Sequence, residues 1–125
     1  MTRRRVVITG LGIVSPVGNT IPEAWDNIVN GRSGIGEITR FDTSAFPVKI
    51  AGEVRGFDLD AYLSPKEARR MDVFIHYGLA AGIQAIKDSG LEVNASNAER
   101  VGVNIGSGIG GLPMIEATHD DFHKG

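Results

Sequence analysis

The stretch "IGSGIGGLPMIE", residues 105–116, joins an apolar run to an amphipathic one through a turn rich in glycine. The run before it, residues 101–105, alternates valine and isoleucine with small or polar residues, which is typical of a strand. Pro113 suits the first turn of a helix. The apolar residues of that helix share one stripe: Leu112, Ile115 and Phe122. The sequence therefore predicts a strand, a turn of bare backbone and a helix in immediate succession.

The preceding residues show the same alternation of strand and helix patterns. The β-branched run at residues 6–8 is typical of a strand buried on both faces. Pro22 suits the start of a helix that Gly31 can end, and residues 32–47 form a loop in this interpretation. Residues 48–54 alternate Val48, Ile50 and Val54 with Lys49 and Glu53, as in a half-exposed edge strand.

A second helical region follows a strong local start signal. Ser64, Pro65 and Glu67 form the pattern of a capping box, and the helical pattern continues, with room for a break, to Ser89 and Gly90. Small residues along it, Gly78, Ala81 and Gly82, allow another backbone to approach closely. Two buried strands separated by helices predict an α/β layered fold with a parallel pair, and a sheet that needs further neighbours.

Composition limits the classes of function. The 125 residues suffice for one domain, 1–125, with 42% hydrophobic and 22% charged residues. A net charge of −2 argues against general nucleic-acid binding. Because there is no cysteine, the chain offers no disulfide, thiolate metal site or thiol nucleophile. The apolar run at residues 6–8 is too short for a signal peptide and residues 78–86 are too short to cross a bilayer, so we expect no membrane insertion and a cytoplasmic location.

The glycines at positions 106, 108 and 111 match the G-x-G-x-x-G pattern that cradles a nucleotide phosphate at a helix N-terminus. That interpretation also requires an acidic residue about twenty positions further on, beyond Gly125. In the alternative interpretation the glycines only make a sharp turn and let the helix pack. The pattern alone is weak, and a nucleotide-binding oxidoreductase fragment stays open as an alternative.

Two further clusters have both a functional and a structural interpretation. His119 and His123 lie one helical turn apart with Asp120 between them, a spacing seen in metal sites, but a packed histidine explains His119 equally well and no metal is expected. His76 lies among apolar residues and is expected to be structural. Lys66, Arg69 and Arg70 share a predicted helical face near the unfavourable end of the helix dipole, which suits either an acidic partner or a solvated face balanced by Glu67 and Asp72.

Five stretches together resemble the bacterial β-ketoacyl-acyl-carrier-protein synthase II family, the elongating condensing enzymes of type II fatty acid synthesis. They are "RRVVITGLGIVSPVGN" (4–19), "FDTSAFP" (41–47), "KEARRMDVFIHYGLAAG" (66–82), "DSGLE" (88–92) and "IGSGIGGL" (105–112). The resemblance implies a thiolase-like fold with two βαβαβ-type halves in a homodimer. This chain would be the incomplete N-terminal part of the first half.

The resemblance also implies a reaction. In this reaction an acyl group moves from acyl carrier protein to an active cysteine. A malonyl thioester is then decarboxylated, and the resulting carbanion attacks the acyl-enzyme. The cysteine and two histidines of the family lie downstream of this chain, so no catalytic residue and no cofactor is expected here, and the chain alone is expected to be inactive or a purely structural fragment. Gly108, Ile109 and Gly110 match the turn that lines the acyl tunnel, and Lys66, Arg69 and Arg70 match the surface that docks the carrier protein.

Overall fold

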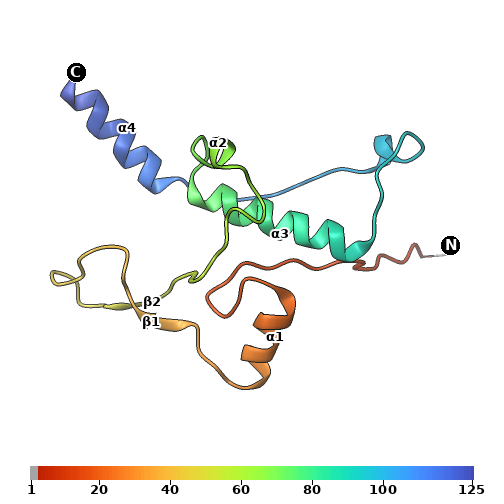
Figure 1. Ribbon diagram of the computed structural model, residues 1–125, viewed down its shortest axis with the longest axis horizontal. Coiled ribbons are helices and arrows are strands. Elements are labelled where there is room, and N and C mark those ends of the chain that lie inside the picture. Colours follow the sequence, from red (N-terminus) through yellow and green to blue (C-terminus); the bar gives the residue numbers. More distant parts are fainter. Residues whose placement is uncertain (1–2) are drawn as a thin grey trace.

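The computed structural model describes residues 3–125 as an open arrangement built around one long central helix (Figure 1). The elements are α1 (Ile21–Val29), β1 (Ile35–Glu37), β2 (Ile50–Gly52), α2 (Pro65–Ala68), α3 (Val73–Ser89), the 3₁₀ turn η1 (Ala98–Arg100) and α4 (Leu112–Lys124). The segment before α1 runs along one side of α3, and the segment that leads to α4 runs along the other (Figure 1). None of the helices within residues 3–125 is long and apolar enough to cross a membrane.

The helices begin and end where their local signals predict. Thr20 caps α1, and Gly31 follows its end with a φ of 65°. Ser64 and Glu67 form the predicted capping box of α2. The helical pattern between Ser64 and Ser89 does break, because α2 ends at Ala68 and Asp72 starts α3 as a new N-cap. Each of these boundaries rests on hydrogen bonds between near neighbours in sequence.

The two predicted buried strands are not formed. Residues 6–8 and 101–105 are extended but pair with no strand, and Val6 and Val103 are 95% and 78% exposed. A strand needs a hydrogen-bonded neighbour, and α3 separates these two segments (Figure 1). Side chains of α3 bind the first segment instead: Asp88 accepts from the amide of Leu11 at 2.8 Å. The expected parallel pair is therefore wrong for this chain, although the mixture of helices with a small sheet agrees with an α/β class.

The sheet that does form is a short antiparallel pair, with Ile35 opposite Gly52 and Glu37 opposite Ile50. The prediction of a loop over residues 32–47 missed β1, because three residues give too little alternation to detect. The strand at residues 48–54 is confirmed only over Ile50–Gly52.

The burial of the second strand is the reverse of the prediction. Val48 and Ile50 are more than half exposed, whereas Glu53 is only 8% exposed. Thr39 donates to Glu53 from its backbone amide at 3.0 Å and from its hydroxyl at 2.8 Å. These hydrogen bonds lower the pKa of the Glu53 carboxyl from its ordinary value, so the buried group stays ionised.

The molecule has almost no apolar core. Its accessible surface is 10364 Å² for a mass of 13.3 kDa, whereas a compact monomer of this mass exposes about 6,500 Å². Among residues 3–125 the only buried hydrophobic residues are Ala24 and Ala80. Trp25 on the apolar face of α1 is 65% exposed. Polar contacts contribute much of the long-range order: Gln84 donates to the Asn19 carbonyl at 2.8 Å and to the Tyr62 hydroxyl at 3.0 Å.

Candidate functional site

The second half of the glycine stretch has a conformation that requires glycine. Gly110 and Gly111 have φ angles of 61° and 67°, in the left-handed region. A Cβ atom on Gly110 would lie 2.9 Å from the ring of Phe74, so the turn is also pressed against the first turn of α3. Gly106 and Gly108, by contrast, have open space where a Cβ would be. Between these two pairs Ile109 is 80% exposed.

The N-terminus of α4 is bound by a carboxylate of the chain itself. Asp72 accepts from the amide of Val73 at 2.6 Å and, through its other oxygen, from the amide of Met114 at 3.2 Å. Asp72 is 8% exposed and, within residues 3–125, it forms no ion pair with the basic residues before it. Its negative charge occupies the position that a phosphate takes in a dinucleotide site. This contact argues against the nucleotide interpretation of the glycine pattern.

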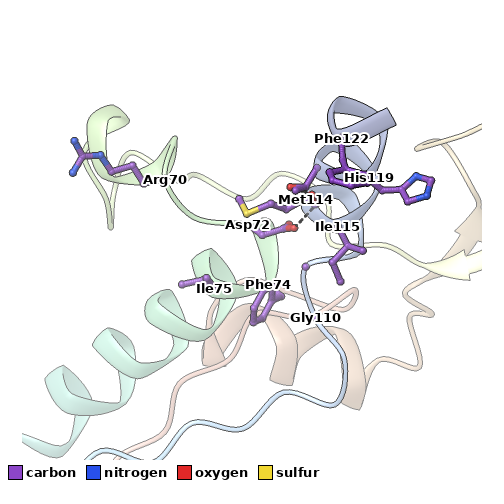
Figure 2. A pocket seen from close by; sticks show the side chains of 11 residues that line it. Arg70, Asp72, Phe74, Ile75, Gly110, Met114, Ile115, His119 and Phe122 are labelled. Atoms are coloured by element: carbon purple, nitrogen blue, oxygen red, sulfur yellow. Dashed lines mark hydrogen bonds between the residues drawn. The ribbon is translucent and has the colours of Figure 1, made fainter. Parts of the chain in front are cut away.

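An open apolar groove of about 690 Å³ lies between α3 and α4 (Figure 2). Phe74 and Ile75 border it from α3, and Met114 and Ile115 border it from α4. Figure 2 shows the Phe74 ring beside Gly110, with the hydrogen bond between Asp72 and α4 above it. Ile109 is not among the groove's lining residues, so its side chain is exposed beside the groove.

The three basic residues do not share one helix, contrary to the prediction. Lys66 lies in α2, Arg69 is its C-cap and Arg70 follows it. All three are exposed and, within residues 3–125, none makes an ion pair. In Figure 2 the guanidinium of Arg70 points away from α4.

The acidic residues assumed to balance this cluster are engaged elsewhere. Glu67 binds the Ser64 hydroxyl at 2.5 Å, a contact that lowers the pKa of the Glu67 carboxyl. Asp72 binds the two helix N-termini described above. Within residues 3–125, neither Glu67 nor Asp72 forms an ion pair with Lys66, Arg69 or Arg70.

The histidines fall into two environments. His76 is 8% exposed, and its Nε2 lies 3.0 Å from the carbonyl of Ala68, so it donates to the end of α2 and supports the structural interpretation. His119 and His123 face each other on α4 with 3.1 Å between their Nε2 atoms. No third ligand completes a metal site with them in the part of the chain that the structure describes.

Asp72 is the residue at this site whose role the sequence did not reveal. Its position directly before the apolar pattern of residues 73–89 is an N-cap signal, and that signal identifies one of its two partners. The second partner, Met114, is 42 residues away, and no local pattern indicates it. The contact between Asp72 and Met114 was therefore not predicted.

Comparison with known proteins gives a consistent assignment. The model of the family described as "Beta-ketoacyl synthase, N-terminal domain" matches residues 3–124. The chain is 59% identical over 119 residues to the 3-oxoacyl-[acyl-carrier-protein] synthase 2 of Vibrio cholerae serotype O1, covering 95% of the chain and 29% of that relative. It is 54% identical over 120 residues to the protein of the same name from Coxiella burnetii, covering 96% and 29%.

A solved structure supports the same assignment at the level of the fold. The structure titled "The ishigamide ketosynthase/chain length factor" is similar with a TM-score of 0.66 and 37% identity, over 73% of this chain and 23% of that one. The chain thus has a ketosynthase fold of the thiolase-like type, and it spans less than a third of the length of these relatives. The chain belongs to the β-ketoacyl synthase family, and its residues 3–124 correspond to that family's N-terminal domain.

Proposed function

We propose that this chain is the N-terminal part of a 3-oxoacyl-[acyl-carrier-protein] synthase II, an acyltransferase that extends fatty acids in the cytoplasm. The observation that carries the proposal is its 59% identity, along 95% of the chain, to a relative of that name. In the proposed reaction an enzyme-bound acyl thioester and a malonyl thioester give a 3-oxoacyl thioester, carbon dioxide and the free enzyme thiol. The thiol is supplied outside residues 1–125, since this chain has no cysteine.

Gly108, Ile109 and Gly110 form part of the acyl pocket in this proposal. The open space at Gly108 allows an alkyl chain to lie against bare backbone. Ile109 is 80% exposed beside it and supplies the one bulky side chain among these three residues. An apolar guest suits this arrangement because it would remove the isoleucine side chain from water.

Lys66, Arg69 and Arg70 form the docking surface for acyl carrier protein in this proposal. The three charges are exposed, and Glu67 and Asp72, the nearest acidic residues in sequence, bind other groups. A carrier protein with an acidic recognition surface would pair with them, and the attraction would accelerate association.

The large exposed apolar surface is covered, in this proposal, by the rest of the subunit and by a second copy in a homodimer. The accessible surface of 10364 Å² exceeds the roughly 6,500 Å² expected for a compact monomer of 13.3 kDa. The exposed residues include Val6 and Ile8 on one side of α3 and Val103 and Ile105 on the other. The two extended segments would gain strand neighbours from the same parts of the protein.

The pocket assignment is tested with Ile109→Phe in a complete subunit that carries this segment. The larger phenylalanine ring should block long acyl chains. We therefore expect kcat/KM for transfer of a palmitoyl group from acyl carrier protein to fall about a hundredfold, and kcat/KM for transfer of an octanoyl group to change little. The matched control is Ile35→Phe, the same change at a half-exposed isoleucine of β1. Equal losses for both acyl lengths would overturn the assignment of Ile109 to the pocket.

A further inference from the structure

We propose that Asp72 is a positioning residue that sets the orientation of the glycine turn at residues 106–111, which carries Ile109. Through this turn, Asp72 would set the acyl length that the enzyme accepts. The inference rests on the proposed function and extends it to a residue outside the pocket. Asp72 lies at the start of α3, and the turn that it would control lies immediately before α4. The observation that joins the two is the hydrogen bond from the Met114 amide to the Asp72 carboxylate, at 3.2 Å.

One carboxylate caps two helices here. One oxygen of Asp72 accepts from Val73 at 2.6 Å, which caps α3, and the other accepts from Met114, which caps α4. No side chain caps α4 at its own N-cap position, because that residue is Gly111. The negative charge lies near the positive ends of both helix dipoles, which strengthens both contacts. The start of α3 and the start of α4 thus meet at Asp72, and we call this junction the corner. The angle between the two helices at the corner therefore depends on Asp72.

The glycine turn is tightly packed on the start of α3 at Gly110 and makes ordinary contacts there at Gly111. A Cβ atom on Gly111 would lie 3.5 Å from the Asp72 carboxylate, and a Cβ atom on Gly110 would lie 2.9 Å from the Phe74 ring. On the other side, Gly106 and Gly108 have no atom in reach of such a Cβ. The position of Ile109 is thus determined by the contacts that Gly110 and Gly111 make with the start of α3. Within that corner, the hydrogen bond to Asp72 is the polar contact that joins the two helices.

The role needs a carboxylate and not merely a polar side chain. Two backbone amides donate to Asp72, one to each oxygen, and a carboxylate offers two acceptors. Asparagine has one acceptor and one NH₂ donor, so Asp72→Asn directs a donor at one of the two amides. Serine is an effective N-cap but is shorter, so Asp72→Ser keeps the cap of α3 and loses the contact with α4.

The experiment compares acyl selectivity in a complete subunit that carries this segment. The measured quantity is the ratio of kcat/KM for palmitoyl-acyl carrier protein to kcat/KM for octanoyl-acyl carrier protein. We expect this ratio to change by about tenfold in Asp72→Asn and in Asp72→Ser, which is the effect of one hydrogen bond to a charged group. The matched control is Asp88→Asn, which removes a carboxylate contact with the Leu11 amide near the other end of α3. The control should leave the ratio unchanged.

The outcomes separate this inference from the proposed function. An unchanged ratio in Asp72→Ser, with equal losses for both acyl lengths, means that Asp72 only stabilises the fold and overturns the inference. If Ile109→Phe still discriminates between the two lengths in that case, the proposed pocket stands without Asp72. If Ile109→Phe does not discriminate, the proposed pocket fails and the inference fails with it. A tenfold change in both Asp72 variants and none in Asp88→Asn supports the role of Asp72.

Discussion

The chain contains two glycine turns that look alike in sequence and differ in what surrounds them. In "TGLGIV" (9–14), the backbone at Gly10 and Gly12 is packed directly on α3, and a Cβ on Gly12 would collide with the carbonyl oxygen of Ala81. In "IGSGIGGL" (105–112), Gly106 and Gly108 have no neighbour at all at the Cβ position. The first turn needs glycine for contacts inside the chain. The second turn packs on α3 only at Gly110 and Gly111 and leaves the space beside Gly106 and Gly108 open.

The same contrast separates the rest of the molecule. Polar groups such as Gln84 and Asp72 find their partners inside the chain, at distances between 2.6 and 3.3 Å. Large apolar side chains such as Trp25 and Ile109 do not, because they are 65% and 80% exposed. The polar contacts join α3 to its neighbours, and most of the large apolar side chains stay exposed.

The largest expected effect concerns the isolated chain. Because only Ala24 and Ala80 are buried apolar residues among residues 3–125, the isolated chain should lack a cooperative unfolding transition and bind a hydrophobic dye. Calorimetry and dye fluorescence on the monomer would measure this. A sharp unfolding transition of the monomeric chain would show that its polar contacts suffice for cooperative folding. The contrast between hydrogen-bonded polar groups and exposed apolar side chains would then not explain its stability.

The next effect separates the two glycine turns in a complete subunit. Gly12→Ala should reduce the free energy of unfolding by about 2–3 kcal/mol, because the new methyl group collides with the backbone of α3. Gly108→Ala should change that free energy by less than about 0.5 kcal/mol, because its methyl group points into open space. Denaturant titration measures both. Similar losses at the two positions would mean that the second turn is as tightly packed as the first.

The last comparison concerns the basic cluster, where only a small effect on the fold is expected. Changing Lys66, Arg69 and Arg70 together to glutamate should leave the thermal midpoint within about 3 °C, since their charges make no ion pair within residues 3–125. The same variant should raise KM for carrier-bound substrates about tenfold at low salt and weaken its salt dependence. Pantetheine thioesters, which lack the carrier protein, serve as the control. If their KM rises equally, the cluster is not a docking surface.

The candidate site was predictable only in part. The likeness of "IGSGIGGL" to the family identified the turn, and the role of Gly108, Ile109 and Gly110 as an acyl pocket stays a prediction. The pattern did not show that Gly110 and Gly111 face inward against Phe74 while Gly106 and Gly108 face outward. Which glycine is packed and which is open depends on α3, and α3 is distant in sequence.

The sequence by itself determined most helix boundaries, because a few adjacent residues form the caps of α1, α2 and α3, whereas α4 is capped by the distant Asp72. Ser64 with Glu67, Asp72 and Gly90 all make the capping contacts or adopt the conformation that their positions predict. Only the tertiary structure decided which extended segments became strands and where the second oxygen of Asp72 binds. A helix satisfies its backbone hydrogen bonds within itself, whereas residues 6–8 and 101–105 need partners from distant parts of a chain, and local sequence does not contain that information.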